Sequence, residues 1–326
     1  MKLVIIEPLG VEQEKLLSMA QEALPEDLET VYYDTRVTGT KELIERGKDA
    51  DIIVVSNLPM NSEVIEGCKN LKLLSVAFTG VDHIAMDTCR KNGVTVCNCA
   101  GYSTVAVADL VFGMVISLYR NIIPCNAAVR NEGTKDGLVG FELEGKKFGI
   151  VGTGAIGLRT AKIARAFGCE VYAYSRTVKE IEGVTYVPLD ELLSVCDIVS
   201  LHTPLTPETK GLIGKKELSM MKKSAILINT ARGPVVDSDA LANALNSGAI
   251  AGAAIDVFEN EPPIKKEHPL LNAKNVIATP HIAFATKEAL VKRAVIVFDN
   301  VAKWAAGDVQ NVMKMCIRDR NNAMLL

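Results

Sequence analysis

His281 is one of only four histidines in the chain, and it follows a proline within the stretch NVIATPHIA. Histidine is the side chain whose unperturbed pKa, about 6.5, suits proton transfer near neutral pH. Two more polar residues follow apolar runs of the same kind, Arg232 in AILINTARGPVVD and Glu261 in AGAAIDVFENEPP. Because the carboxyl ends of parallel strands meet at one edge of a sheet, we expect the three side chains to lie together.

A histidine, a carboxylate and a guanidinium in one place could reduce a carbonyl group that stands beside a carboxylate. The histidine would donate the proton that the carbonyl oxygen needs when hydride reaches the carbon. A carboxylate against the other ring nitrogen fixes the tautomer and favours the protonated ring, and this is the role expected of Glu261. Arg232 would hold the substrate carboxylate and stabilise the negative charge that develops on the keto oxygen. We therefore predict that Arg232, Glu261 and His281 are the catalytic residues.

Each of the three residues also has an ordinary structural role open to it. Arg232 could cap the loop turned by Gly233 and Pro234, and Glu261 could be an exposed charge before two prolines. His281 could pack at the boundary of a strand. The order and spacing of the three residues favour the catalytic interpretation over these separate roles.

The glycine-rich segment KKFGIVGTGAIGLRTAKIARAFG predicts a site for a dinucleotide. It follows an apolar run and opens an amphipathic helix, which is the context that the dinucleotide-binding fingerprint requires. Gly152 allows a tight turn, Gly154 lets the backbone approach a pyrophosphate, and Gly157 lets the helix pack closely on the strand. The phosphates would then meet the free amides of the helix N-terminus. We predict NAD(P)(H) as the cofactor, and no metal.

The end of the next strand favours NADP(H) over NAD(H). NAD-binding units usually carry an acidic residue there, about 20 residues beyond the glycines, to hold the ribose 2′-hydroxyl. This chain instead has Ser175 and Arg176 in YAYSRT. A guanidinium can pair with a 2′-phosphate through two hydrogen bonds. The alternative is that Arg176 is a solvated charge at the end of a strand.

The apolar runs alternate with amphipathic stretches in two series, which predicts an α/β fold with two doubly wound parallel sheets. The first series contains KLVII, TVYY, DIIVV, LKLLSV and GVTVC, and the second begins at KKFGIVG and ends at NVIATP. A long apolar helix from about Ser103 to Ile122 joins them, and an amphipathic helix follows the second series. We expect a substrate-binding domain of residues 1–99 and 286–314, with a dinucleotide-binding Rossmann domain of residues 100–285 inserted into it.

Composition excludes several classes of partner. The formal charge is −3 and the pI is about 5.9, which gives no basic surface for nucleic acid. Asp109 and Arg120 interrupt the most apolar segment, so that it falls short of the ~20 residues needed to cross a bilayer. Eight cysteines lack the spacing of a zinc site and are interpreted as reduced thiols. We therefore expect a cytoplasmic protein with neither a nucleic-acid nor a membrane partner.

The C-terminal residues 315–326 are interpreted as a non-native tail. MCIRDR, from Met315 to Arg320, back-translates naturally to ATG TGT ATA AGA GAC AG, which resembles a transposon-end adaptor of sequencing libraries. We therefore leave this segment out of the fold prediction, as one would a fusion scar. Finding these codons in uninterrupted genomic DNA would refute the interpretation.

The chain resembles the D-isomer-specific 2-hydroxyacid dehydrogenases over residues 1 to about 313. The resemblance includes GTGAIG, SLHTPLTPETKGLI, LINTARGPVVD, AGAAIDVFENEPP and TPHIA, in the order and spacing of that family. It implies two Rossmann-like domains, of which the substrate domain is flavodoxin-like, and a catalytic set of Arg, Glu and His that matches the three residues above.

The resemblance also implies further contacts. Backbone amides of Phe78, Thr79 and Gly80 in AFTGVD would face the substrate carboxylate, and Asp256 would face the nicotinamide. Cofactor contacts are expected at Thr104, Ala155, Ile156, His202, Thr203, Pro204, Thr230, Ala231 and Ala283. His202 competes with His281 as a strand-end acid, but no carboxylate segment like ENEPP follows it. His83 and His268 are interpreted as surface or packing residues.

We therefore expect an NAD(P)-dependent oxidoreductase that interconverts a small unphosphorylated 2-keto acid and its 2-hydroxy acid. Glyoxylate, hydroxypyruvate and branched-chain keto acids are the candidates, because the loop around Leu58 and Met60 is mostly apolar. Val55 stands where family members that act on 3-phosphoglycerate have arginine, so phosphoglycerate dehydrogenase is a weaker alternative. A formate dehydrogenase would pair its histidine with Gln instead of Glu261. Another alternative is a dinucleotide-sensing corepressor on the same fold. The family further implies a homodimer.

Overall fold

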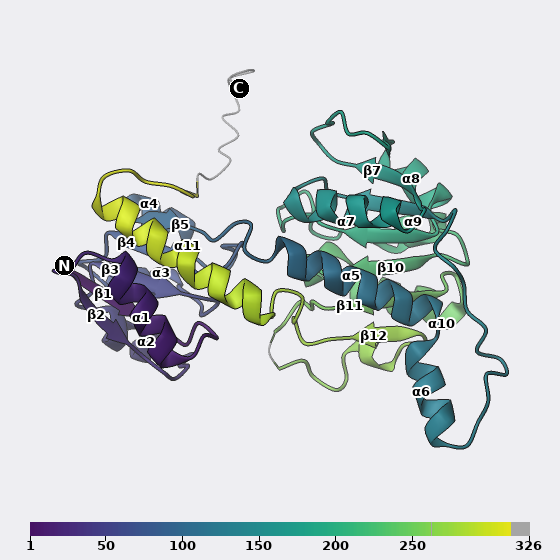
Figure 1. Cartoon of the computed structure of the whole chain (residues 1–326), viewed down its shortest axis with the longest axis horizontal. Coiled ribbons are helices and arrows are strands. Elements are labelled where there is room, and N and C mark those ends of the chain that lie inside the picture. Colours follow the sequence, from purple (N-terminus) through teal and green to yellow (C-terminus); the bar gives the residue numbers. More distant parts are fainter. Residues whose placement is uncertain (262, 314–326) are drawn as a thin grey trace. The chain divides into compact units, whose positions relative to one another are not determined.

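The computed structural model describes residues 1–261 and 263–313, and the proposed non-native tail lies outside these ranges. The chain divides into two compact units (Figure 1). Unit 1 comprises Met1–Tyr102 and the segment from Lys287 onward, and unit 2 comprises Ser103–Thr286. The sequence had placed the two boundaries after residues 99 and 285.

Unit 1 is built on a parallel sheet of five strands in the order β2-β1-β3-β4-β5. Its strands are β1 (Lys2–Ile5), β2 (Glu29–Tyr32), β3 (Ile52–Val55), β4 (Leu73–Val76) and β5 (Thr95–Cys97). Its helices are α1 (Gln13–Ala23), α2 (Thr40–Gly47), α3 (Ser62–Gly67), α4 (Met86–Lys91) and α11 (Lys287–Ala305). Every residue of β3 and β4 is buried, which explains why parallel strands covered on both faces read as continuous apolar runs.

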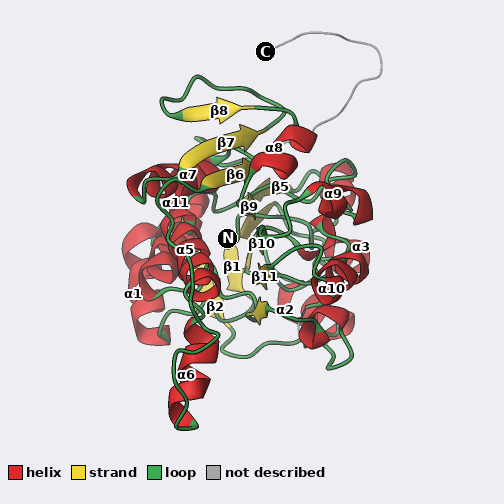
Figure 2. Cartoon of the chain, turned by 90° about the vertical axis from the view of Figure 1, so that its right-hand side faces the viewer, coloured by secondary structure: helices red, strands yellow, loops and turns green. Residues whose placement is uncertain are grey.

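Unit 2 is built on a parallel sheet of seven strands in the order β12-β11-β10-β9-β6-β7-β8. Its strands are β6 (Lys147–Val151), β7 (Glu170–Tyr174), β8 (Val184–Tyr186), β9 (Ile198–Leu201), β10 (Ile226–Asn229), β11 (Gly252–Ile255) and β12 (Val276–Ala278). Its helices are α5 (Thr104–Tyr119), α6 (Ile122–Arg130), α7 (Ala155–Ala166), α8 (Leu189–Val195), α9 (Lys215–Met220) and α10 (Ser238–Ser247), with 3-10 turns η1 (Gly233–Val235) and η2 (Pro269–Asn272). Figure 2 shows helices on both sides of the strands.

Two apolar clusters form the core of unit 2, one on each face of its sheet. One contains Leu192, Leu218 and Leu241, which come from α8, α9 and α10. The other is built from α5 and α7 and includes Phe112 stacked on Phe148 at 5.6 Å. A doubly wound sheet of this kind confirms the predicted fold class.

The apolar joining segment forms α5, which packs against α7 and buries eight of its residues. Within the described ranges, no single helix has both the length and the apolarity to cross a bilayer. The pair α5 and α6 meets those two criteria together, with a bend of 56° between the helices.

Candidate functional site

The glycine-rich turn between β6 and α7 has the geometry expected of a phosphate cradle. Gly152 has a φ of +101°, and a Cβ there would press on the carbonyl of His202. A Cβ on Gly157 would clash with the carbonyl of Gly152, so the helix requires this glycine to pack on the turn. A Cβ on Gly154 would meet no atom within 4 Å. The space before the helix N-terminus therefore fits a pyrophosphate group.

Three threonine hydroxyls in unit 2 support a polar ligand at the same edge of the sheet. They belong to Thr153, Thr203 and Thr230, which follow β6, β9 and β10. Each hydroxyl is buried and has no hydrogen-bond partner among the described residues. Buried polar atoms are normally paired, so these hydroxyls fit the polar groups of a dinucleotide. The sequence had predicted Thr203 and Thr230 as cofactor contacts, but not Thr153.

Two cations, Arg176 and Lys179, follow β7, and the second of them reaches the glycine-rich turn. Ser175 is half-buried and Arg176 is exposed. The Lys179 ammonium donates a hydrogen bond to the Thr153 carbonyl at 3.0 Å. The position of Lys179 could not be predicted from the sequence, because only the path of the chain after β7 brings it back to this turn.

His281 and Glu261 form a direct pair beyond the carboxyl ends of β12 and β11. The distance from His281 Nδ1 to Glu261 Oε2 is 2.5 Å, and both side chains are about one-fifth to one-quarter exposed, at 24% and 20%. The other oxygen of Glu261 accepts the backbone N–H of Phe258, which holds the carboxylate in place. The structure thus joins the two residues that the sequence had assigned to one proton-transfer site.

His281 lies in a backbone conformation that non-glycine residues rarely adopt. Its φ is +54°, a left-handed value that costs an L-residue about 1–3 kcal/mol and persists only where the surroundings impose it. The His281 N–H donates to the Asp256 carbonyl at 2.8 Å. The Phe284 ring packs edge-on against the imidazole, with centroids 5.5 Å apart. Such a held, strained residue is typical of functional turns.

Asp256 holds the turn that carries His281. The carboxylate is fully buried and accepts hydrogen bonds from the Thr279 hydroxyl at 2.5 Å and from the N–H groups of Ile282 at 2.8 Å and Ala283 at 2.9 Å. Burial raises the pKa of Asp256, and these hydrogen bonds partly offset the rise. The sequence had placed Asp256 against the nicotinamide. That role stays a prediction, and the structure adds that both carboxylate oxygens accept hydrogen bonds from the turn of His281.

Arg232 lies in the turn after β10, the strand beside β11. Buried Asn229 shapes this turn by accepting from the Ala231 N–H at 3.0 Å and donating to the Arg232 carbonyl at 2.9 Å. Gly233 packs so closely on the backbone of residues 258–259 that no Cβ would fit. The turn of Arg232 therefore lies against the segment that ends in Glu261. The role of Gly233 in this contact could not be predicted from the sequence.

The other two histidines of unit 2 do not compete with His281. Burial lowers the pKa of His202 to about 3, so its ring is neutral near pH 7 and contacts the Ser200 hydroxyl at 2.9 Å. His268 uses both ring nitrogens inside the protein, one with Glu259 at 3.0 Å and one accepting from the Leu270 N–H. The role of His281 as the acid stays a prediction, and its Nδ1 is paired with Glu261.

Apart from Thr104, the remaining cofactor positions predicted from the sequence lie in the turns just described or next to them. Ala155 and Ile156 open α7, Pro204 follows Thr203, Ala231 follows Thr230, Ala283 ends the turn of His281, and Thr104 begins α5. No contact links Thr104 to the glycine-rich turn in the hydrogen bonds of the described residues.

In unit 1 the segment from Phe78 to Gly80 follows β4. The Phe78 carbonyl accepts from the Cys99 N–H at 2.9 Å, and the Thr79 carbonyl accepts from the Asn98 side chain at 2.7 Å. Thr79 is exposed and Phe78 is only 7% exposed. The loop is therefore held by hydrogen bonds to its carbonyl groups.

Leu58 and Met60 are fully buried. The structure therefore gives no support to the use of these two side chains as a measure of the substrate pocket, because neither reaches the surface. Their apolar character is explained by the core of the protein.

Comparison with known proteins identifies the family. Residues 112–283 match the family model described as D-isomer specific 2-hydroxyacid dehydrogenase, NAD binding domain. The chain is 37% identical to a hydroxypyruvate reductase of Blautia hydrogenotrophica, covering 96% of this chain and 99% of the relative. It is 38% identical to a D-3-phosphoglycerate dehydrogenase of Methanocaldococcus jannaschii, but covers only 59% of that protein.

Solved structures agree with this result. A D-lactate dehydrogenase of Aquifex aeolicus, complexed with NAD and lactic acid, superposes with a TM-score of 0.83 at 33% identity, covering 94% of this chain and 96% of that one. Its two ligands are a nicotinamide cofactor and a 2-hydroxy acid. The chain belongs to the D-isomer-specific 2-hydroxyacid dehydrogenase family, and it is a nicotinamide-dependent oxidoreductase acting on CH–OH groups.

Proposed function

We propose that the protein reduces a small unphosphorylated 2-keto acid to its D-2-hydroxy acid, and catalyses the reverse oxidation, with His281 as the acid and base. The observation that carries this proposal is the contact between His281 and Glu261, in the unit that also holds the glycine-rich turn. An imidazole paired with a carboxylate at a strand end is suited to proton transfer. When bound, the nicotinamide supplies or accepts the hydride.

Glu261 engages Nδ1 of His281, so a proton exchanged with substrate would travel through Nε2. In reduction the protonated ring gives its proton to the carbonyl oxygen, and the carboxylate stabilises the positive charge of the ring beforehand. In oxidation the neutral ring takes the hydroxyl proton. Both directions keep the same pair and change only the proton count of the ring.

Arg232 is proposed to bind the substrate carboxylate and to stabilise charge on the keto oxygen. A guanidinium offers several donors in a fixed plane, which suits two neighbouring oxygen groups. The rigid turn around Asn229 and Gly233 supports this role, because a positioned donor stabilises developing charge without reorganising. In unit 1, the amides of Phe78, Thr79 and Gly80 are proposed to bind the same class of carboxylate.

NADP(H) is proposed as the preferred cofactor. Two cations, Arg176 and Lys179, follow β7, and no acidic residue lies between Ser175 and Lys179 to hold a ribose 2′-hydroxyl. The hydrogen bond from Lys179 to Thr153 keeps one of these charges at the glycine-rich turn. A 2′-phosphate carries negative charge that two such cations would neutralise.

The substrate is proposed to lack a phosphate, with glyoxylate, hydroxypyruvate and branched-chain keto acids as candidates. Val55 is buried at the end of β3 and supplies no cation for a phosphate group. This residue is the support for the choice, because the buried Leu58 and Met60 no longer contribute to it.

A homodimer is proposed, with α6 and the segment after it as the contact surface. Helix α6 has no buried residue, and it exposes 55% of Ile123 and 74% of Val129. Val139 in the following loop is 79% exposed. Apolar side chains gathered on a surface mark an interaction site. Sedimentation of Val129→Glu against the unsubstituted protein tests this, and a monomeric unsubstituted protein would contradict it.

Cytoplasmic localisation is likewise proposed. The seven cysteines of the described ranges are free thiols, and burial raises the pKa of most of them. Free thiols are typical of reducing compartments.

The experiment for the activity is a spectrophotometric screen of NADH and NADPH oxidation against a panel of 2-keto acids. We expect steady-state turnover with at least one candidate and a preference for NADPH. Cofactor binding without turnover on any member would instead favour a dinucleotide-sensing corepressor.

A further inference from the structure

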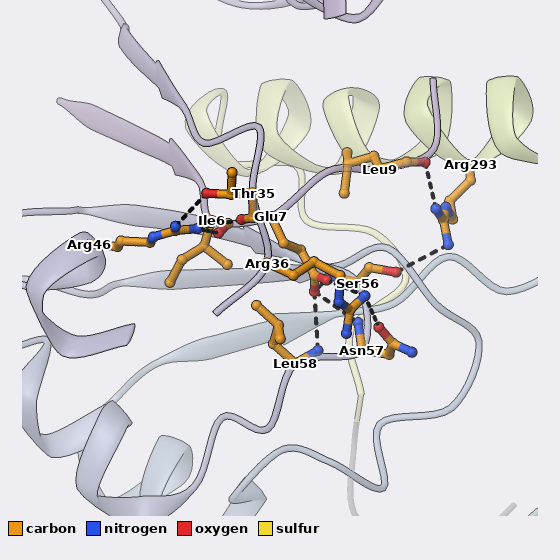
Figure 3. Close-up of polar contacts among 10 residues, drawn as sticks. All are labelled: Ile6, Glu7, Leu9, Thr35, Arg36, Arg46, Ser56, Asn57, Leu58 and Arg293. Carbon is orange, nitrogen blue, oxygen red and sulfur yellow. Dashed lines mark hydrogen bonds and ion pairs between the residues drawn. The ribbon is translucent and has the colours of Figure 1, made fainter. Parts of the chain in front are cut away.

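Glu7 is a fully buried carboxylate that the proposed chemistry does not use. It follows β1, and one of its oxygens accepts three consecutive backbone N–H groups, from Ser56 at 2.7 Å, Asn57 at 3.0 Å and Leu58 at 3.1 Å. The other oxygen pairs with Arg36 at 2.8 Å. Figure 3 shows these groups converging on the loop after β3.

Two guanidinium groups hold the side chains of the same loop. Arg36 donates to the Asn57 side chain at 2.7 Å. Arg293, on α11 and only 3% exposed, donates to the Ser56 hydroxyl at 3.1 Å and to the Leu9 carbonyl at 2.5 Å. Backbone and side chains of the 56–58 loop are therefore fixed from three directions (Figure 3).

The position of this network in the sheet points to a ligand. In the order β2-β1-β3-β4-β5, the strand that follows β1 in the chain lies on one side of it, and the next three strands lie on its other side. The gap between β1 and β3 is therefore the topological switch point. Ligands of open parallel sheets bind beyond the carboxyl ends of the strands at such a point. Glu7 and the 56–58 loop lie at the two sides of it.

The neighbouring loop is the one proposed to bind the substrate carboxylate. Strands β3 and β4 are paired from Ile52 with Leu73 to Val55 with Val76, and the Ala77 N–H donates to the Val55 carbonyl at 2.7 Å. The 56–58 loop therefore begins beside the start of the 78–80 loop. A shift of the first loop would be felt by the second.

Stability alone does not explain why a charged residue supports this loop. Burying a carboxylate costs several kcal/mol, which its partners must offset, and well-packed apolar residues often serve stability equally well. Here the charge draws three amides to one oxygen, and this sets their direction as well as their contact. Such control of direction is what a binding loop requires.

We propose that Glu7 is a positioning residue for substrate binding, which fixes the 56–58 loop of unit 1 and, through it, the neighbouring 78–80 loop that is proposed to bind the carboxylate of the 2-keto acid. Arg36 and Arg293 add contacts to the side chains of Asn57 and Ser56. This inference rests on the proposed function. It concerns unit 1 alone, so it predicts an effect on keto acid affinity that leaves the cofactor affinity of unit 2 unchanged.

The test compares Glu7→Gln with Glu29→Gln, an exposed carboxylate of the same sheet that pairs with Lys2. Hydrogen bonds to a charged group are stronger than neutral ones, so Glu7→Gln should raise the KM for the best keto acid about tenfold. We expect kcat and the Kd of the reduced cofactor to stay within about threefold. Glu29→Gln should leave all three values unchanged. Because Arg36 is exposed, Arg36→Met provides a second variant if Glu7→Gln does not fold, and it should raise KM in the same direction.

Binding of oxamate, a non-reducible analogue of a 2-keto acid, gives a readout without turnover. Calorimetry should show weaker oxamate binding to Glu7→Gln than to the unsubstituted protein. A folded Glu7→Gln with unchanged KM and oxamate affinity would overturn this inference and leave the proposed function standing. Oxamate binding that depends on Glu7, without turnover of any keto acid, would overturn the proposed reaction alone. Failure to bind oxamate at all would overturn both.

Discussion

Glu7 and Asp256 are fully buried carboxylates that do similar work in different units. Each follows a strand, β1 or β11, and each accepts backbone N–H groups from the loop after the neighbouring strand, β3 or β12. Glu7 binds three amides and has Arg36 as a counterion. Asp256 binds two amides and a hydroxyl, and no ion pair accompanies it in the described residues.

The difference shows what each loop is held for. The loop held by Glu7 carries no titratable side chain, and its anchor is itself held by an ion pair with Arg36. The loop held by Asp256 carries His281 in a left-handed conformation, and its anchor is a carboxylate whose pKa burial has raised. The first arrangement suits binding, and the second places the group that moves a proton.

The largest expected effect comes from removing the proton donor itself while the residues that hold its loop stay in place. His281→Ala should lower kcat by about 10²–10⁴, because it removes the proton donor and leaves the cofactor turns intact. The Kd of the reduced cofactor, measured by fluorescence titration, should change little. His268→Ala is the matched control, since it removes the other histidine that pairs with a glutamate. If the kcat of His281→Ala at neutral pH were close to that of the unsubstituted protein, another group would be the acid.

The next effect compares the two anchors directly. Asp256→Asn should lower kcat by about 10- to 100-fold, because small displacements of a catalytic group are costly to the rate. Glu7→Gln, in contrast, should act on KM. Steady-state kinetics of both variants with one keto acid provides the comparison. If both variants changed kcat and KM in the same way, Glu7 would not serve substrate binding and Asp256 proton transfer as separate roles.

Much of this site could be predicted from the sequence, because its residues directly follow apolar runs. Arg232, Glu261 and His281 are each a few residues beyond a strand, and a parallel sheet brings those ends to one edge. The role of Glu7 could not be predicted. It depends on β1 lying beside β3, and the three amides that it accepts are 49 to 51 residues away in the chain. No local pattern specifies which strands become neighbours.

Other features were missed because their signal was weak or concealed. Strand β8 has three residues, none of them fully buried, so it shows no apolar run. Asp256 follows a strand just as a ligand-facing residue would, and only the path of residues 279–283 shows that it is enclosed. Lys179 reads as an ordinary surface charge until its contact with Thr153 is known.

A smaller effect concerns the cofactor site of unit 2. Arg176→Ala should weaken NADPH binding by about tenfold, since it removes one charged partner of the 2′-phosphate, and should affect NADH binding much less. Lys179→Ala should act in the same direction. The Kd values of both cofactors are measured by fluorescence titration, with Lys162→Ala on α7 as the control. Equal losses for NADH and NADPH would remove the case for a phosphate site.

The smallest effect concerns the charge on Asp256. Its pKa in the folded protein is raised above the ordinary value of 3.8, mainly by burial, so the folded state holds this proton more tightly than the unfolded state. The resulting stabilisation is fully present below pH 3.8 and is lost as the pH rises through the raised pKa. Asparagine does not titrate. The stability difference between the unsubstituted protein and Asp256→Asn should therefore shrink as the pH rises through that window, and stay constant above it.

Thermal melts between about pH 3.5 and 7 measure this difference, at roughly 2–4 °C for each kcal/mol in a unit of this size. Asp109→Asn, an exposed carboxylate of the same unit, removes an equal charge and corrects for general effects of pH. A difference that grew with rising pH would mean that the hydrogen bonds from Thr279, Ile282 and Ala283 outweigh burial. The folded protein would then favour the ionised form of Asp256, and the contrast between the two carboxylates would reduce to the loops that they hold.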